Sequence, residues 1–308
     1  MSTPASHRSG FACFVGRPNA GKSTLTNAIV GTKVAITSSK PQTTRTVVRG
    51  IVHRPEAQLI LVDTPGLHRP RTLLGERLND LVHGTWSEVD VVAVCFPANE
   101  KPGPGDRFLV NELTKVRRPT KIAVATKTDL VSPQELGAHL LAIDALGRET
   151  GTDWAEIVPV SAKNGDQVGL LTDLLIAQMP EGPRLYPDGE LTDAPEEVLV
   201  AELIREAALE GVHDELPHSI AVIVEEMALK EGRPDDKPLL LIHANVFVER
   251  DSQKGIVIGH KGSRLREVGT EARQQIQALL GTPVYLDLHV KIAKDWQRDP
   301  KQLCKLGF

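Results

Sequence analysis

The stretch GRPNAGKST spans residues 16 to 24 and directly follows the apolar run FACFV at residues 11 to 15. Gly16, Gly21, Lys22 and Ser23 give the spacing G-x-x-x-x-G-K-S between a predicted strand and a predicted helix. Glycines allow the backbone to wrap closely around a phosphate, so that amide groups and the helix N-terminus point at it. In such a loop the lysine reaches the β- and γ-phosphates and the serine hydroxyl binds Mg²⁺. A helix-capping glycine turn is the alternative, but the preceding strand favours a phosphate-binding loop.

Apolar runs of strand length recur in the first half of the chain: FACFVG, TVVRGIV, AQLILVD, VDVVAVCF, KIAVAT and EIVPVSA. Helix-like stretches such as LLGERLNDLVHGT and LLTDLLIAQM separate most of them. Strands that are apolar on both faces and alternate with helices indicate a mostly parallel sheet with helices on both sides. The sequence therefore predicts an α/β domain of the P-loop type over residues 10–180, after a disordered N-terminus at residues 1–9.

A stretch rich in proline and glycine, PEGPRLYPDGELTDAPEE, follows this block and predicts an interdomain linker over residues 181–195. The remainder, residues 196–308, has a different order of elements. A helix-like segment precedes two strand-like runs, SIAVIVEEM and LLLIHANVFVE, and a glycine-flanked loop lies between two further helical segments. A last strand, PVYLDLHVKI, completes the order α-β-β-α-α-β, so we expect a smaller α+β domain here.

The composition excludes few functions. The chain has 308 residues, is 41% hydrophobic and 25% charged, and carries a formal net charge of −4, as is typical of a globular protein. Cys13, Cys95 and Cys304 are far apart and in no metal-ligand spacing, which fits a reducing cytosol. The N-terminus has no apolar signal-peptide core, and no run reaches about 18 apolar residues. We therefore expect a cytoplasmic protein.

The third predicted strand, AQLILVD, ends in Asp63 and is followed by Thr64, Pro65 and Gly66. A carboxylate at the end of a strand suits a water-mediated contact to Mg²⁺, and the Gly66 amide suits a contact to a γ-phosphate. The tetrapeptide DTPG is also typical of a β-turn with proline at its second position. Its place 40 residues after the lysine of the phosphate-binding loop, one strand away, favours the nucleotide role.

Two further strand ends indicate which base the nucleotide carries. KIAVAT ends in TKTD, residues 126 to 129, and EIVPV is followed by SAK, residues 161 to 163. The Asp129 carboxylate can accept two hydrogen bonds from the N1–H and exocyclic amine of guanine, a donor pair that adenine lacks. The Lys127 stem can cover the base face, and the Ala162 amide can meet guanine O6. Each motif alone is weak, but their order and placement at strand ends together favour GTP.

The polar stretch SSKPQTTRT, residues 38 to 46, lies between the first predicted helix and the second predicted strand. An ordinary polar loop is one interpretation. The other is a loop whose Thr44 hydroxyl and backbone meet Mg²⁺ and the γ-phosphate. Such a loop becomes ordered with the triphosphate and is released after hydrolysis.

These motifs together resemble the GTPase domains of the TRAFAC class. GRPNAGKST, PQTTR, DTPGLH and SAKNG, with VIGHKG further along, resemble the Era family of bacterial GTPases over essentially the whole chain from about residue 10. The resemblance implies a C-terminal type II KH domain, which agrees with the order of elements predicted above. It also implies hydrolysis of GTP, binding to the 3′ end of 16S ribosomal RNA, and a role in assembly of the 30S subunit. Members are cytoplasmic, with peripheral contact at the inner face of the cell membrane, and a monomer is expected.

The motifs and the resemblance give the expected site residues. Hydrolysis is expected to depend on Lys22, Thr44 and Gly66, and Mg²⁺ on Ser23, Thr44 and, through water, Asp63. The residues expected to bind GTP are Gly16, Arg17, Pro18, Asn19, Ala20, Gly21, Lys22, Ser23, Thr24, Asp63, Thr64, Pro65, Gly66, Leu67, Thr126, Lys127, Thr128, Asp129, Ser161, Ala162 and Lys163.

Three positions bear on the rate of hydrolysis, on nucleotide affinity and on the binding of a second cation. Leu67 stands where many small GTPases place a water-orienting glutamine, and leucine cannot hold a water by hydrogen bond, so intrinsic hydrolysis should be slow. Thr126 stands where the family usually has asparagine, and we expect its hydroxyl to bond the nearby backbone, with guanine specificity retained and affinity somewhat weaker. Asn19 resembles the asparagine that related GTPases use to hold K⁺ near the phosphates, although a loop asparagine bonding its own backbone is the alternative.

In the second predicted domain, GHKG at residues 259 to 262 precedes a helix. In KH domains a G-x-x-G loop clamps the backbone of about four single-stranded nucleotides. A glycine turn at a helix N-terminus is the alternative interpretation of the tetrapeptide. The resemblance and the surrounding elements favour RNA, and the residues expected to bind it are Ile258, Gly259, His260, Lys261, Gly262, Arg264 and Arg266.

The charge distribution agrees with an RNA-binding surface at this loop. Residues 196–253 hold 14 acidic and 5 basic side chains, whereas residues 254–273 and 291–305 each hold 5 basic and 2 acidic ones. A solvated helix face is the alternative for each basic run. The proline-rich stretch PANEKPGPGDRF, residues 97 to 108, receives no function from the sequence.

The leading hypothesis is a GTP-hydrolysing switch that binds ribosomal RNA. A nucleotide-gated module for single-stranded RNA, in which hydrolysis is incidental, is the alternative, and Leu67 favours it. An accessory GTPase for RNA modification is a third class, but that family carries a C-terminal cysteine motif, whereas Cys304 lies alone.

Overall fold

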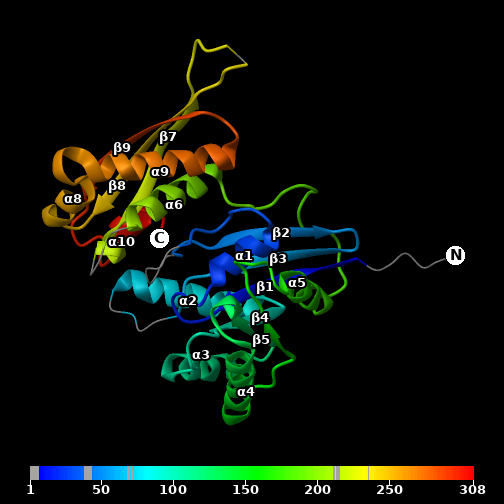
Figure 1. Ribbon diagram of the computed structural model, residues 1–308. Helices are drawn as coiled ribbons and strands as arrows, with labels where there is room; N and C mark the ends of the chain where they lie inside the picture. The colour runs from blue at the N-terminus through cyan, green and yellow to red at the C-terminus, as the bar shows by residue number, and fades with distance from the viewer. Residues whose placement is uncertain are drawn as a thin grey trace. The chain divides into compact units, whose positions relative to one another are not determined.

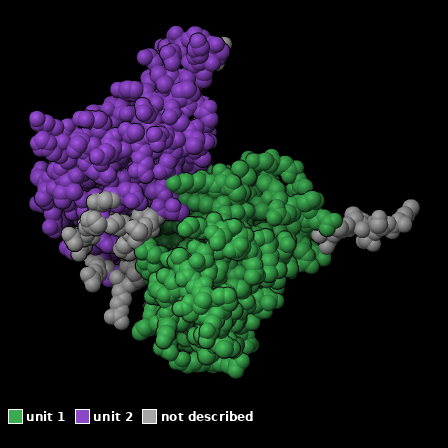
Figure 2. All heavy atoms as spheres, viewed as in Figure 1, with its two compact units in different colours: residues 1–35, 44–69, 78–193 green, residues 36–43, 70–77, 194–308 purple. Residues whose placement is uncertain are grey.

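The chain folds into two compact units, which Figure 2 shows in different colours. The computed structural model describes residues 7–37, 44–67, 70, 72–210, 212, 216–234 and 236–308. The first unit comprises residues 1–35, 44–69 and 78–193, and the second comprises residues 36–43, 70–77 and 194–308. None of the helices in the described ranges combines the length and the apolar character needed to cross a membrane.

The first unit is built on a six-stranded sheet with the strand order β2-β3-β1-β4-β5-β6. Edge strand β2 is antiparallel to β3, and the other neighbours are parallel, which confirms the mostly parallel sheet predicted from the sequence. The strands are β1 (Arg8–Val15), β2 (Val48–Arg54), β3 (Ala57–Asp63), β4 (Val91–Pro97), β5 (Thr120–Thr126) and β6 (Glu156–Pro159).

Two apolar layers form because the sheet is buried on both faces. Along β1, Ala12 and Phe14 point into one layer and Cys13 and Val15 into the other, as the two-residue period of a strand requires. Helices α1 (Lys22–Val30) and α5 (Val168–Ala177) cover the first face. Helix α3 (Pro104–Thr114), helix α4 (Pro133–Thr150) and the later turns of α2 (Leu73–Glu88) cover the second (Figure 1).

Strand β1 begins at Arg8, two residues before the domain boundary expected at residue 10. Arg8 pairs with Ala57 of β3, its guanidinium donates to the carbonyl of Met179 at 2.7 Å, and the Ser9 hydroxyl donates to that of Pro183 at 2.6 Å. These contacts order Arg8 and Ser9, which lie within the N-terminus expected to be disordered. Residues 1–6 of the predicted N-terminus lie outside the described ranges.

The second unit contains a three-stranded sheet with the order β7-β8-β9, in which β7 is antiparallel and β9 parallel to β8. Helices α6 and α9 pack on one face of it through a shared apolar core (Figure 1). This is the α-β-β-α-α-β order of a type II KH domain, with α7 and α10 as short additions. The elements are α6 (Glu196–Leu209), α7 (Leu216–Ser219), β7 (Ala221–Leu229), β8 (Leu240–Val248), α8 (Asp251–Ile258), α9 (Ser263–Leu280), β9 (Val284–Ile292) and α10 (Pro300–Lys305).

The second unit also includes two short segments from the N-terminal half of the chain. Ile36 is buried in the same apolar core as α6, and the backbone amide and hydroxyl of Thr37 donate to the Glu206 carboxylate at 2.8 and 3.1 Å. The Leu74 amide donates to the carbonyl of Gln297, and the Arg77 guanidinium donates to Phe308 at 2.7 Å. Sequence patterns gave no indication of these contacts, because they join residues far apart along the chain.

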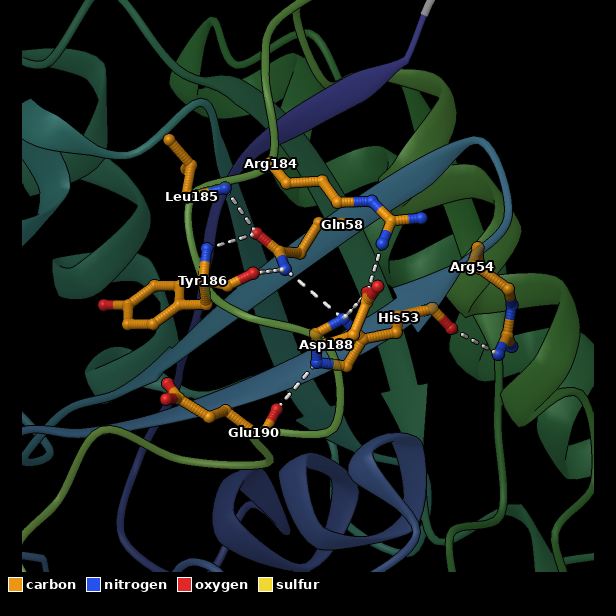
Figure 3. Close-up of polar contacts among 8 residues, drawn as sticks. All are labelled: His53, Arg54, Gln58, Arg184, Leu185, Tyr186, Asp188 and Glu190. Carbon is orange, nitrogen blue, oxygen red and sulfur yellow. Dashed lines mark hydrogen bonds and ion pairs between the residues drawn. The ribbon is translucent and has the colours of Figure 1, made fainter.

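The predicted linker is anchored on the first unit. We call residues 180–193 the strap, and Figure 3 shows its contacts with β2 and β3. Buried Gln58 accepts from the backbone amides of Leu185 and Tyr186 at 2.7 and 2.9 Å and donates to the carbonyl of Tyr186 at 2.9 Å. The strap also continues the sheet, because the Ile51 amide donates to the carbonyl of Leu191 at 2.9 Å. Its prolines prevent a regular helix without preventing order.

We expect Gln58→Ala to release the strap. The substitution would leave two backbone amides and one carbonyl of the strap without these partners, so the free energy of unfolding should fall by about 1–3 kcal/mol. Chemical denaturation measures this loss, and limited proteolysis should cut first within residues 184–193. Arg54→Ala is the matched control, since exposed Arg54 contacts the carbonyl of its own neighbour at 3.5 Å. Equal stability and equal cleavage of the two variants would contradict the anchoring role.

Candidate nucleotide site and nucleic-acid interface

The loop between β1 and α1 has the backbone that close wrapping around a ligand requires. A Cβ atom on Gly16 would lie 2.8 Å from the carbonyl oxygen of Cys95 on β4, so no side chain fits there. Asn19 has a φ of 61° and Gly21 a φ of 87°, both in the left-handed region. These conformations turn the chain from the end of β1 into the first turn of α1. The predicted phosphate-binding residues 16–24 therefore form one compact loop.

Lys22 lies inside this loop. Its ammonium is buried and donates to the carbonyls of Gly16 and Arg17 at 3.2 and 3.1 Å. Burial lowers the pKa of Lys22, and the neighbouring Asp63 carboxylate opposes that shift. A Cβ atom on Gly66 would lie 3.6 Å from the same ammonium, so the DTPG segment approaches the loop closely. The lysine is thus held at the place where the charge of a bound phosphate would be compensated.

Three oxygen donors converge beside the start of α1. The Ser23 hydroxyl donates to an oxygen of the Asp63 carboxylate at 2.9 Å, and the Thr44 hydroxyl donates to the same oxygen at 3.2 Å. The two hydroxyls lie 3.3 Å apart. Mg²⁺ prefers hard oxygen ligands, so this arrangement fits the three residues expected to hold it.

A cavity of about 270 Å³ lies beside the ends of β5 and β6. Asp129 lines it, and the Ser161 hydroxyl donates to its carboxylate at 2.7 Å, which fixes the orientation of the acceptor. Lys127 precedes it with a left-handed φ of 57°. An apolar wall and one oriented carboxylate suit a planar base with two donors. The lining residues are Gly21, Thr24, Leu25, Thr126, Lys127, Asp129, Leu130, Val160, Ala162 and Lys163.

Thr126 and Leu67, the two unusual positions, both have packing partners. The buried Thr126 hydroxyl donates to the carbonyl of Ala20 at 2.7 Å, which ties the end of β5 to the phosphate-binding loop. The expected bond to nearby backbone is therefore present. Leu67 packs against the apolar layer beneath α2, α3 and α4. Its side chain has no hydrogen-bonding atom with which to orient a water.

Part of the predicted switch region lies outside the described residues. This applies to residues 38–43 of SSKPQTTRT and to His68 after DTPGL, whereas Thr44, Arg45 and Thr46 are described.

In the second unit, GHKG forms a short 3-10 turn, η2 (His260–Gly262), between α8 and α9. A Cβ atom on Gly259 would lie 2.6 Å from the Cβ of Arg264, and φ is 72° at Gly259 and 77° at Gly262. Both glycines are therefore required by the backbone. Lys261 also has a left-handed φ, of 51°, and its side chain is exposed.

The two predicted arginines of α9 have different surroundings. The Arg264 guanidinium donates to the carbonyl of Ala207 at 3.2 Å and also bonds Glu210 at the end of α6, so it helps to hold the domain together. Arg266 donates to the carbonyl of Lys261 at 3.3 Å and lines a groove of about 360 Å³ between α9 and β9. We therefore favour Arg266 over Arg264 as a ligand contact.

This groove contains residues that the sequence analysis missed. It is lined by Gly262, Leu265, Arg266, Gly269, Thr270, Arg273, Tyr285, Leu286 and Leu288. Arg273 follows Arg266 by seven residues and so shares its helix face, a spacing that could have revealed it. Tyr285 is 54% exposed at the edge of the sheet, and its strand position alone gave no indication of a groove.

Comparisons with known proteins match both parts of the chain. Residues 11–127 match a family described as 50S ribosome-binding GTPase, and residues 215–297 match the KH domain family. The chain is 79% identical over 302 residues to GTPase Era of Nocardioides sp., with 98% of this chain and 96% of the relative covered. It is 66% identical over 302 residues to GTPase Era of Mycolicibacterium smegmatis, with 98% and 99% covered.

Two solved structures are similar over nearly the whole chain. One is Era in complex with MgGDPNP and nucleotides 1506–1542 of 16S ribosomal RNA, with a TM-score of 0.91 and 37% identity, covering 98% of this chain and 99% of that one. The other is a variant of Aquifex aeolicus Era bound to GDP and AlF4⁻, with a TM-score of 0.90 and 36% identity, covering 97% and 99%.

The base pocket predicts a specific effect of Asp129→Asn. The new amide would turn donors toward the guanine donors, so GTP affinity should fall by about 3 kcal/mol or more, and affinity for xanthosine nucleotides should rise. Titration with both nucleotides measures this exchange. Asp173→Asn, an exposed position on α5 outside the pocket, is the matched control. Unchanged GTP affinity in the Asp129 variant would rule out the guanine assignment.

Proposed function

Because this chain belongs to the Era family of GTPases, we propose that it is a GTP-hydrolysing switch that binds the 3′ end of 16S ribosomal RNA. We further propose that it acts in assembly of the 30S subunit. The observation that carries the proposal is the similarity over 98% of the chain to an Era structure holding both MgGDPNP and 16S ribosomal RNA. The phosphate-binding loop, the Asp129 pocket and the α9–β9 groove supply matching features in this chain.

We assign GTP hydrolysis to the first unit. The Lys22 ammonium, already buried against two carbonyls, would face the β- and γ-phosphates, and the Gly66 amide would meet the γ-phosphate. Ser23, Thr44 and Asp63 would hold Mg²⁺, which neutralises phosphate charge when bound. Since Leu67 packs in the apolar layer, the attacking water must be oriented by backbone groups or by a group supplied from elsewhere.

Asn19 is the residue to which we assign potassium binding. Its left-handed φ of 61° places it at the sharp turn of the phosphate-binding loop. A cation beside the β- and γ-phosphates would supply the positive charge that an arginine finger supplies in other GTPases.

The potassium proposal predicts that replacing Na⁺ by K⁺ accelerates GTP hydrolysis at constant ionic strength. Asn19→Ala should remove the difference between the two salts, because the side-chain oxygen of the asparagine is lost. The measurement is the steady-state rate of phosphate release in each salt. Equal rates of the unsubstituted protein in both salts would eliminate the assignment.

RNA binding is assigned to the groove of the second unit. Lys261, Arg266 and Arg273 place positive charge beside GHKG, and Gly262 borders open space in which a nucleotide backbone could approach closely. Leu265, Leu286 and Leu288 provide an apolar floor on which bases can lie. The acidic surface of residues 196–253 would repel duplex nucleic acid outside the groove.

The alternative, a nucleotide-gated RNA module with incidental hydrolysis, is favoured by one observation, the packing of Leu67. Stimulation of GTP hydrolysis by RNA would speak for the switch. A cytoplasmic monomer with peripheral contact at the inner membrane face completes the proposal, and these properties rest on the family resemblance alone.

Gly262→Asp should abolish RNA binding while GTP binding stays intact. A carboxylate would face RNA phosphate in the groove, and Gly262 is far in sequence from every predicted GTP-binding residue. Gly232→Asp is the matched control, since Gly232 has the same left-handed φ, of 73°, in the β7–β8 hairpin and lines no part of the groove.

The measurement is affinity for a 16S 3′-end oligonucleotide with GDPNP and with GDP, at one salt concentration. A switch requires a difference between the two nucleotides, about 5- to 150-fold for a coupling of ordinary size. Identical RNA affinities with GDPNP and GDP would show that the two domains act independently, and the switch proposal would then be wrong.

A further inference from the structure

Arg17, the second residue of the phosphate-binding loop, makes its side-chain contacts with another part of the first unit. Its Nε donates to Asp106 at 2.8 Å and its Nη2 donates to Glu100 at 3.0 Å. The side chains of Arg17, Asp106 and Glu100 are 29%, 3% and 46% exposed, so the Asp106 contact is the buried one. A guanidinium with two carboxylates has a fixed direction, because its donors lie in one plane.

The Asp106 carboxylate belongs to a rigid part of the fold. Its second oxygen accepts from the backbone amide of Gly103 at 2.8 Å, which caps the N-terminus of α3 with Pro104 in the first turn. Leu109, Val110 and Leu113 anchor that helix in the apolar layer. The proline-rich stretch that had no function in the sequence therefore presents a fixed acceptor to Arg17.

The fit between this stretch and Arg17 is close. A Cβ atom on Gly105 would lie 3.0 Å from Cδ and 3.5 Å from Cγ of Arg17. The aliphatic part of the Arg17 side chain therefore packs closely against the backbone of Gly105. The stem and the guanidinium are thus both held.

The main chain of Arg17 contacts the catalytic centre. Its carbonyl oxygen accepts from the Lys22 ammonium at 3.1 Å and from the Ala20 amide at 3.2 Å. One residue therefore connects a buried carboxylate on α3 to the ammonium that is assigned to the phosphates. A shift of Arg17 would move an acceptor of Lys22 directly.

We propose that Arg17 is a positioning residue for GTP hydrolysis, in which the ion pair with Asp106 fixes the Arg17 carbonyl and so orients Lys22 toward the γ-phosphate. This inference rests on the assignment of Lys22 to the phosphates in the proposed function. The pair acts on the rate of hydrolysis more than on GDP binding, because only GTP carries the γ-phosphate, and the amides of the loop would hold the β-phosphate of GDP together with Lys22. Small displacements matter here, since a misplacement of about 1 Å can cost about 100-fold in rate.

The test uses two substitutions that keep the size of the side chain. Asp106→Asn removes the charge opposite Arg17, and Arg17→Lys keeps the charge and the helix cap but loses the planar guanidinium. For each full-length variant, kcat for GTP hydrolysis, the affinity for GDP and the midpoint of thermal unfolding are measured. Arg107→Gln is the matched control, because the neighbouring Arg107 directs its guanidinium to Glu149 in an exposed two-point contact at 2.9 Å, away from Arg17.

We expect kcat to fall about tenfold in Asp106→Asn and less in Arg17→Lys, with GDP affinity within about twofold of the unsubstituted protein. The double variant should be no slower than Asp106→Asn alone, because both changes break one interaction. Arg107→Gln should hydrolyse GTP at the unsubstituted rate.

Two outcomes would overturn the inference. One is a kcat equal to that of Arg107→Gln, and the other is a parallel loss of kcat, GDP affinity and thermal stability, which a purely structural contact would give. Lys22→Ala separates this failure from failure of the proposed function. If Lys22→Ala abolishes hydrolysis while the Asp106 and Arg17 variants remain fully active, the positioning role alone is wrong. If Lys22→Ala remains active, the phosphate assignment is wrong and the positioning role falls with it.

Discussion

The buried ammonium of Lys22 is the constraint on which the nucleotide site depends. A charged amine without water is costly unless other groups compensate it, and here two carbonyls and the Asp63 carboxylate do so. The carbonyls can converge because the backbone between β1 and α1 turns sharply at Asn19 and Gly21, and because Gly16 has no side chain to collide with β4. A bound phosphate would add further negative charge opposite the Lys22 ammonium. The loop is thus built around a buried cation.

The same constraint explains why so much of the first site could be predicted from sequence. A buried lysine in a tight loop requires glycines at fixed spacing. Asp63 and Asp129 lie at or just after the carboxyl ends of parallel strands, so both lie on the same side of the sheet. These requirements are local or follow from strand order, so they appear as recognisable spacings in the amino-acid sequence. The left-handed glycines of GHKG are predictable for the same reason. Apolar runs of strand length, mostly separated by helix-like stretches, predicted the strands of the first unit, and the structure confirms them.

Contacts between distant parts of the chain were not predictable in this way. Gln58 holds the strap across 127 and 128 residues, and Arg17 meets Asp106 across 89. A buried glutamine and a loop arginine look like ordinary polar residues until their partners are known. Arg264 illustrates the same limit, because its position beside GHKG predicted an RNA contact but gave no indication that its guanidinium also bonds carbonyls at the end of α6. Residue type and spacing indicate the local backbone conformation, but they do not show which distant side chains bond to it.

Chain connectivity limits how the two functions can be independent. Ile36 and Thr37 belong to the second unit, whereas Thr44, seven residues after Thr37, bonds Ser23 and Asp63 in the first. A change in the position of Thr44 on loss of the γ-phosphate must therefore be accommodated within that short segment or passed to Thr37 and its bonds to Glu206. If it is passed on, thermodynamic reciprocity applies, and RNA binding must change GTP affinity by the same factor as GTP changes RNA affinity. The proposed switch would then need no separate transmitting element, because Thr44, which we assign to Mg²⁺ and the γ-phosphate, lies eight residues after Ile36 of the core beneath α6.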